Sequence, residues 1–349
     1  MSDVPHLRFP EFSGEWEKYT IGDLCEEFKS GKNIKAESIQ EEGVYPVFGG
    51  NGLRGYTDRY NHDGDYVLIG RQGALCGNVR FVTGKTYITE HAIAAKATND
   101  NYTRYLEYLF VRLNLGQFSD QSAQPGLAVN KLLKIETYVP SKAEQLKIAF
   151  LLRLLDERIA TQNKIIEKLE SLIKGIAHRV AGMGKPNVRI AECLECTSST
   201  LQESEVSDLG TYPVYGANGI VGFLDSYNTP DEAIYIVKDG SGVGSVAYVK
   251  GKCSATGTLN ILTAKQDYSL QFLYYLLKVF NFEPYKTGMA IPHIYFKDYG
   301  KAKIFCSLYS KQLRYAKMLE AIDAKLLIEQ KILISLNSQK QYLLRQMFI

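Results

Sequence analysis

Apolar residues recur at alternating intervals of three and four along two stretches of the chain, 141–182 and 308–349. This spacing is the a/d pattern of a heptad repeat, and it predicts two long helices that pair along an apolar seam. Gln162 interrupts the first seam and Glu329 interrupts the second at the same place, and Lys340 interrupts the second again. The other positions that we expect to pair are Leu152, Leu155, Ile159, Ile166, Leu169, Leu319, Ile322, Leu326, Leu333 and Leu336.

The stretch that precedes each helix has a different pattern. Short apolar runs such as DYVLIG (65–70) and AIYIV (233–237) are bounded by Gly, Asn and Asp, which is typical of strands joined by tight turns. A helical apolar patch interrupts each stretch, at 102–113 and at 268–280. The expected fold class is therefore α+β, with two mixed α/β domains and two long helices.

The two halves of the chain are copies of one unit. YPVFGGNG (45–52) returns as YPVYGANG (212–219), and the same interval of 167 residues aligns the two helices. The repeat predicts one domain at 1–140 followed by a helix at 141–182, and a second domain at 183–307 followed by a helix at 308–349. Two helices of equal length favour pairing with each other, as an antiparallel coiled coil, over burial of each against its own domain.

Composition narrows the possible functions only slightly. The chain has 349 residues and a net charge of +3, which permits a nucleic-acid partner if the positive charge is clustered but does not demand one. It has no apolar run of membrane-spanning length, and its six cysteines are scattered without a second pair to complete a zinc site. We therefore expect a cytoplasmic protein without a membrane partner or a metal.

Catalytic motifs are missing from the sequence. There is no NPP[YF] motif for adenine methylation, and TGKT (83–86) lacks the earlier glycine of a phosphate-binding loop. His91 is a possible catalytic residue, but Thr258 takes its place in the second copy. We expect no catalytic residue in this chain.

A family resemblance is carried by the segments LRFPEFSGEWEKYTIGDL (7–24), YPVFGGNGLRGY (45–56), LIGRQGALCGNV (68–79), EQLKIAFLLRLLDERI (144–159), KLESLIKGIAHRV (168–180) and YLLRQMFI (342–349). Together they resemble the specificity subunit (HsdS) of type I restriction-modification systems, over essentially the whole chain. One departure is Lys311, which stands where the first copy has Glu144 and puts identical partner contacts at the two helices in doubt.

The resemblance implies a non-catalytic subunit that recognises double-stranded DNA. Its two target-recognition domains would each read one half of a bipartite, asymmetric target, and the length of the helix pair would set the spacer. Family members assemble with two methyltransferase subunits, which use S-adenosylmethionine, and with restriction subunits that translocate DNA with ATP and Mg²⁺. These cofactors would belong to the partner subunits and not to this chain.

The candidate DNA-reading residues are those that differ between the two copies of the repeat, although the glycines around them are the same. Arg71 and Gln72 stand opposite Lys238 and Asp239, and Arg54 stands opposite Val221. Arg pairs naturally with guanine and Gln with adenine, so two different half-sites are expected. Lys85 and Lys252, which both copies keep, are expected to contact phosphates.

Two other interpretations remain open. The chain could be a stand-alone enzyme with duplicated α/β domains and an unrecognised pocket, or a coiled-coil scaffold with no role on DNA. In either case the candidate DNA-binding residues would be solvated loop residues.

The polar interruptions of the seams predict how the halves associate. Antiparallel pairing would bring Gln162 to Glu329 in the full chain, whereas a dimer of residues 183–349 would bring two Glu329 carboxylates together. We therefore expect residues 1–182 to dimerise more tightly than residues 183–349.

Overall fold

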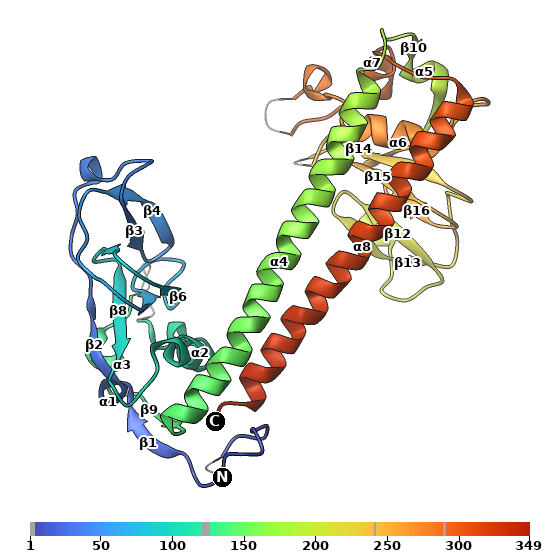
Figure 1. Ribbon diagram of the computed structural model, residues 1–349. Coiled ribbons are helices and arrows are strands. Elements are labelled where there is room, and N and C mark those ends of the chain that lie inside the picture. The colour runs from blue at the N-terminus through green and yellow to red at the C-terminus, as the bar shows by residue number, and fades with distance from the viewer. Residues whose placement is uncertain (1–3, 121–125, 241, 289–290) are drawn as a thin grey trace. The chain divides into compact units, whose positions relative to one another are not determined.

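The computed structural model describes residues 4–120, 126–240, 242–288 and 291–349 (Figure 1). The chain packs as two units, one formed by Met1–Gln162 with Ile332–Ile349 and the other by Asn163–Lys331. The long helices are α4 (Lys142–Ala181) and α8 (Tyr309–Gln346). The sequence-based boundaries treat each helix as a segment of its own, whereas the structure divides both helices between the units.

The first unit contains three sheets, with strand orders β2-β8-β5-β6, β4-β3-β7 and β1-β9. Its strands are β1 (Glu17–Thr20), β2 (Cys25–Ser30), β3 (Tyr45–Gly49), β4 (Gly52–Thr57), β5 (Tyr66–Gly70), β6 (Val79–Val82), β7 (Tyr87–Ile88), β8 (Ala92–Ala97) and β9 (Glu136–Val139). Its shorter helices are α1 (Ile21–Leu24), α2 (Thr103–Leu113) and α3 (Val129–Leu132).

The second unit repeats this topology, with strand orders β11-β17-β14-β15, β13-β12-β16 and β10-β18. Its strands are β10 (Val188–Arg189), β11 (Leu194–Ser198), β12 (Tyr212–Gly216), β13 (Gly219–Leu224), β14 (Ala233–Val237), β15 (Val246–Val249), β16 (Ser254–Ala255), β17 (Leu259–Ala264) and β18 (Lys303–Ile304). Its shorter helices are α5 (Ile190–Cys193), α6 (Leu270–Lys278) and α7 (Phe296–Tyr299).

The repeat is kept at the level of single backbone angles. Strands β3 to β8 correspond to β12 to β17 residue for residue, and both hairpins carry an irregularity at the same place, after Val47 and after Val214. Gly52 and Gly219 open the second strand of each hairpin with φ of 99° and 108°, a region where other residues are strained. The shared glycines therefore preserve one hairpin geometry in both copies.

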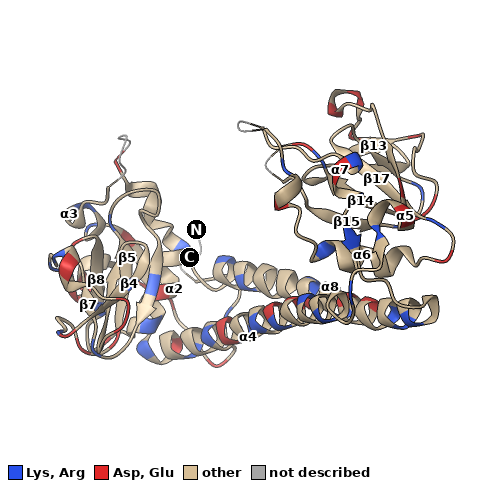
Figure 2. Cartoon of the chain, turned by 90° about the horizontal axis from the view of Figure 1, so that it is seen from above, with Lys and Arg blue, Asp and Glu red and all other residues tan. Residues whose placement is uncertain are grey.

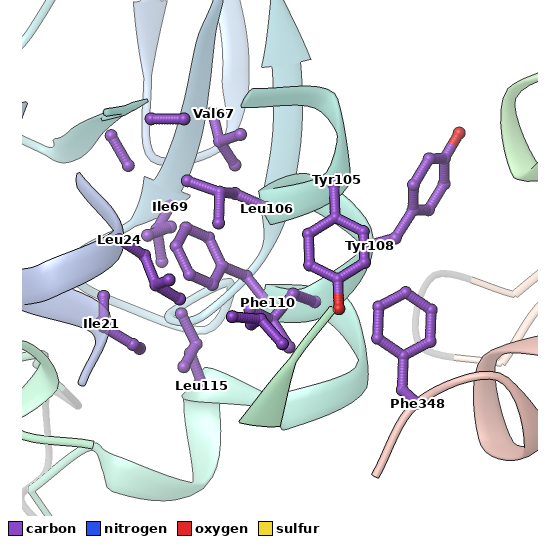
Figure 3. Packing of buried hydrophobic residues seen from close by; sticks show 14 of the residues in the cluster. Ile21, Leu24, Val67, Ile69, Tyr105, Leu106, Tyr108, Phe110, Leu115 and Phe348 are labelled. Carbon is purple, nitrogen blue, oxygen red and sulfur yellow. The ribbon is translucent and has the colours of Figure 1, made fainter. Parts of the chain in front are cut away.

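In the first unit, α2 covers the four-stranded sheet (Figure 3). Tyr105, Leu106 and Phe110 are fully buried, and they belong to one cluster with Val67 and Ile69 of β5. The residues that follow α8 join this core, because the rings of Phe348 and Tyr105 stack with centroids 5.3 Å apart. The last residues of the chain thus complete the core of the first domain.

Within each unit the two long helices run antiparallel. In the first unit, Leu152 near the start of α4 shares a core cluster with Leu344 near the end of α8. In the second unit, Ala177 near the end of α4 shares a cluster with Leu319 near the start of α8. All twelve residues expected to pair along the seam, including Gln162 and Glu329, are buried or half-buried.

Candidate nucleic-acid interface

The tip of the β3–β4 hairpin, residues 49–52, packs against two backbone segments of the first domain. A Cβ atom on Gly50 would lie 2.6 Å from the carbonyl oxygen of His91 and 3.6 Å from the backbone nitrogen of Arg71. Only glycine permits so close an approach. The contact gathers residues 49–54 and 71–72 at one end of the domain, which we call the first hairpin edge; residues 216–221 and 238–239 form the second hairpin edge.

Three predicted DNA-binding residues, Arg54, Arg71 and Gln72, lie together at the first hairpin edge. The side chain of Arg54 lies over Gly49, and its Cδ is 2.8 Å from the position that a Cβ atom would take on that glycine. The backbone N–H of Arg71 donates to the carbonyl of His91 at 2.9 Å, which fixes the strand end that carries it. Neither arginine forms an ion pair with a described residue, and a guanidinium group carries five N–H donors that can bind a ligand.

The second hairpin edge has the same backbone and a different charge. The N–H of Lys238 donates to the carbonyl of Thr258 at 2.9 Å, as Arg71 does to His91. Asp239 lies 3.7 Å from His293, measured from Oδ1 to Nδ1. A Cβ on Gly216 would meet the carboxylate of Glu203 at 2.7 Å, where the first copy has the side chain of Arg54. Carboxylates thus occupy an edge that is basic in the first copy.

The two lysines that both copies keep, Lys85 and Lys252, lie away from these edges. Lys85 Nζ is 4.8 Å from the centre of the Tyr60 ring, and Lys252 Nζ is 4.9 Å from the centre of the Tyr227 ring. Tyr60 packs on Tyr45, at the start of a strand whose other end is Gly49, about 13 Å away at 3.3 Å per residue. The structure therefore separates the predicted phosphate contacts from the predicted base-reading residues by about the length of one strand.

Sequence reasoning missed one basic residue at the first hairpin edge. Arg80 is exposed on β6, and its guanidinium lies across Gly52, with Nη2 3.1 Å from the position of a Cβ on that glycine. The signal was present in the sequence, because Arg80 stands opposite Ala247 within the aligned stretch that supplied Arg71 and Lys238. As at the other candidate positions, the side chain differs between the two copies while the surrounding glycines stay the same.

Polar side chains along the long helices pair with residues of the domains and with one another. The hydroxyl of Tyr108 donates to Asp156 at 2.8 Å, and that of Tyr275 donates to Asp323 at 2.6 Å, at the equivalent place of the repeat. Burial first, and then the carboxylate, raises the pKa of each tyrosine above its ordinary value, so both stay protonated donors. Lys340, which interrupts the second seam, forms an ion pair with Asp156 at 2.5 Å.

The start of each long helix is tied to its own domain by a buried glutamine. The side-chain oxygen of Gln145 accepts from the N–H of Tyr102, at the start of α2, and that of Gln312 accepts from the N–H of Ser269, at the start of α6, both at 3.0 Å. The preceding residue differs. Glu144 is buried and accepts two hydrogen bonds of 2.8 Å from Arg8, whereas Lys311 is exposed.

Outside these polar contacts, charged residues of both signs are interspersed along the long helices (Figure 2). Within the described ranges, no cluster of His, Cys, Asp and Glu could hold a metal ion. Nor does any helix of the described chain have the length and hydropathy needed to cross a membrane.

A family model for the type I restriction modification DNA specificity domain matches residues 13–171 and 187–338. The chain belongs to this family. The two matched stretches coincide with the two copies of the repeat, and members of the family are DNA-recognition subunits without catalysis of their own. The resemblance, the fold class and the expectation of a non-catalytic DNA-recognition subunit are therefore confirmed.

Individual relatives agree with this assignment. The EcoprrI specificity subunit of Escherichia coli is 41% identical over 154 residues, which are 43% of this chain and 38% of that protein. A type I specificity subunit of Mycoplasma genitalium, S.MgeORF438P, is 25% identical over 95% of this chain and 94% of its own length. The crystal structure of an S subunit from M. genitalium has the same fold, with a TM-score of 0.76 at 21% identity and 99% coverage of both chains.

Proposed function

We propose that the chain reads a bipartite, asymmetric DNA target, with each strand-rich domain contacting one half-site through its hairpin edge. The observation that carries this proposal is that two edges with the same backbone present different side chains. Arg54, Arg71 and Gln72 form one edge, and Lys238, Asp239 and the nearby Glu203 form the other. The arginines of the first edge would donate to guanine, whereas the carboxylates of the second edge would accept from the amino group of a base, so the two edges would select different bases.

Lys85 and Lys252 are proposed to hold the DNA backbone. Each keeps its ammonium group on a tyrosine ring at the same place in its copy, which is suited to a contact that carries no sequence information. Phosphate contacts of this kind make binding weaken steeply with salt.

The long helices are proposed to fix the spacing of the half-sites and to dock two methyltransferase subunits, to which restriction subunits can be added. In this assembly the methyltransferase subunits bind S-adenosylmethionine and the restriction subunits use ATP and Mg²⁺. This chain would supply neither a catalytic residue nor a cofactor ligand.

The test is the pattern of methylation that the chain directs. We would express it with the methyltransferase of its own system in a host that lacks the modification, and sequence the methylated DNA. The expected result is an interrupted asymmetric motif that carries N6-methyladenine, and exchange of residues 15–140 for another recognition domain should change one half alone. Methyl transfer by the purified chain without a partner would contradict the proposal, as would a change in both halves.

A further inference from the structure

Arg80 occupies a place at the first hairpin edge that the second copy leaves empty. In the second copy, Ala247 stands at this position, and a Cβ on Gly219 would meet nothing within 4 Å. A hollow of about 100 Å³, lined by Gly216, Gly219 and Ala247 among others, lies beside that hairpin. The second domain therefore forms its hairpin without an arginine, so the arginine is not required by the fold.

The neighbours of Arg80 place it with the other arginines of the first edge. Gly49 and Gly52 stand opposite each other across the tip of the hairpin. Arg54 lies at the position that a Cβ atom would take on Gly49, and the guanidinium of Arg80 lies at the position of a Cβ atom on Gly52. The two arginines thus each lie over one of the paired glycines of the hairpin tip.

The charge of Arg80 is not offset by an acid within the described chain. It forms no ion pair with a described residue, although thirteen pairs between a Lys or Arg and an acid are formed elsewhere among those residues. Glu90, an acid on the strand connection beside the edge, contacts His91 at 3.2 Å. An exposed arginine with no acidic partner, held flat across a glycine, has its planar donors available for a ligand.

We propose that Arg80 is a specificity-determining residue of the first half-site, where its guanidinium donates to the O6 and N7 atoms of a guanine in the major groove. The inference rests on the proposed function and extends it to a residue and a base. A guanidinium matches these two acceptors with two parallel hydrogen bonds, which an ammonium group cannot reproduce. Arg80→Lys therefore separates a base contact, which it should lose, from a phosphate contact, which it should keep.

The experiment compares the methylation motifs directed by the full chain and by its variants Arg80→Ala and Arg80→Lys, each with the methyltransferase of its own system. We expect the wild type to require guanine at one position of the first half-site. Both variants should relax that position, by about 10-fold to 100-fold in preference, and leave the second half-site and the spacer unchanged. The unchanged half is the control for folding.

Arg59→Lys is the matched control. Arg59 is also exposed and forms no ion pair with a described residue, but it follows the far end of β4 and lies against Tyr87, 5.7 Å from the ring centre. This variant should keep the wild-type motif. If Arg80→Lys keeps the guanine requirement while Arg80→Ala weakens methylation at all sites alike, Arg80 is a phosphate contact and the inference is wrong. A wild type without a bipartite motif would instead refute the proposed function itself.

Discussion

The two copies keep the same backbone and differ in charge at their hairpin edges. The first edge carries Arg54, Arg71 and Arg80, whereas the second carries Lys238 with Asp239 and Glu203. The bounds of β3 to β8 match those of β12 to β17 residue for residue, both hairpins carry the same irregularity, and equivalent glycines have similar φ angles. The shared glycines therefore determine the backbone of each hairpin edge, and the residues between them can differ and so determine which ligand is bound.

A second contrast concerns the ends of the long helices, where each completes the core of a domain. Leu344, Met347 and Phe348 pack in the first unit, and the equivalent residues of α4 in the second unit are the smaller Ala177, Val180 and Ala181. Each domain therefore fits a helix end of one size. This difference favours the pairing of unlike halves over the pairing of like halves.

Substitutions at Phe348 and Ala181 test whether each domain accepts only a helix end of its own size, and we expect them to have the largest effect on stability. Phe348→Ala removes a ring that is 3% exposed and stacks on Tyr105, so it should lower the free energy of unfolding of the first unit by about 3 kcal/mol. Ala181→Phe should destabilise the second unit by about 1–3 kcal/mol through overpacking. Urea unfolding followed by hydrogen exchange, which reports each unit separately, measures both. Equal tolerance of the two changes would show that the helix ends are interchangeable.

The next prediction compares Glu144 with Lys311, which stand at equivalent positions of the two long helices. Glu144→Ala leaves the guanidinium of Arg8 without its two hydrogen bonds, and because Arg8 can still reach water we expect a loss of about 2 kcal/mol in the first unit. Lys311→Ala, at the equivalent exposed position, should change stability by less than about 0.5 kcal/mol. Thermal unfolding of the two variants beside the wild type checks this, and equal losses would contradict it.

A smaller effect should separate two tyrosines that occupy equivalent positions. Tyr275→Phe removes the hydroxyl that donates to Asp323, and no described cation pairs with this carboxylate, so about 1.5 kcal/mol should be lost. Tyr108→Phe should lose about 0.5–1 kcal/mol, since Lys340 still pairs with Asp156. The same denaturation measurement tests the order. The reverse order would mean that Lys340 does not support Asp156 in solution.

The edge of the second copy gives a prediction of similar size. Glu203→Gln keeps the shape of the side chain that lies over Gly216 but replaces one acceptor oxygen with a donor. If Glu203 accepts from the amino group of a cytosine, preference at one position of the second half-site should fall by about 1–2 kcal/mol. Methylation sequencing with the same partner subunit reports it. An unchanged second half-site would remove Glu203 from the reading edge.

Much of this architecture could be predicted from the sequence. The interval of 167 residues aligns β3 to β8 with β12 to β17 because the turns between them require glycine. The heptad spacing named twelve seam residues, and all twelve are buried or half-buried. The sequence shows that Arg80 stands opposite Ala247, but only the structure shows that Arg80 lies over Gly52 and that Glu203 lies over Gly216. Long-range contacts of this kind leave no local pattern.

The smallest expected effect concerns the negative charge of Glu329 in the helix seam. Glu329 is 6% exposed, and its carboxylate pairs with Lys325 on the same helix. In the first unit Asp156 pairs with Lys340, and in the second Ala177 shares a core cluster with Leu319. If each of these pairs lies level, the same register between two copies of α8 would set Glu329 level with Ile334, next to Leu333, in a dimer of residues 183–349. The two carboxylates would then stand on neighbouring layers, each with its own lysine.

Repulsion between them should therefore be weak. We still expect residues 1–182 to dimerise more tightly than residues 183–349, and we expect Glu329→Gln to narrow the difference by less than about 1 kcal/mol, in the range of an ion pair screened by solvent. Sedimentation equilibrium of both halves and of the variant, at low and at high salt, measures the difference. A large gain for Glu329→Gln that disappears in salt would mean that the like-charge contact is direct, and that the register of the half-chain dimer differs from the register within the full chain.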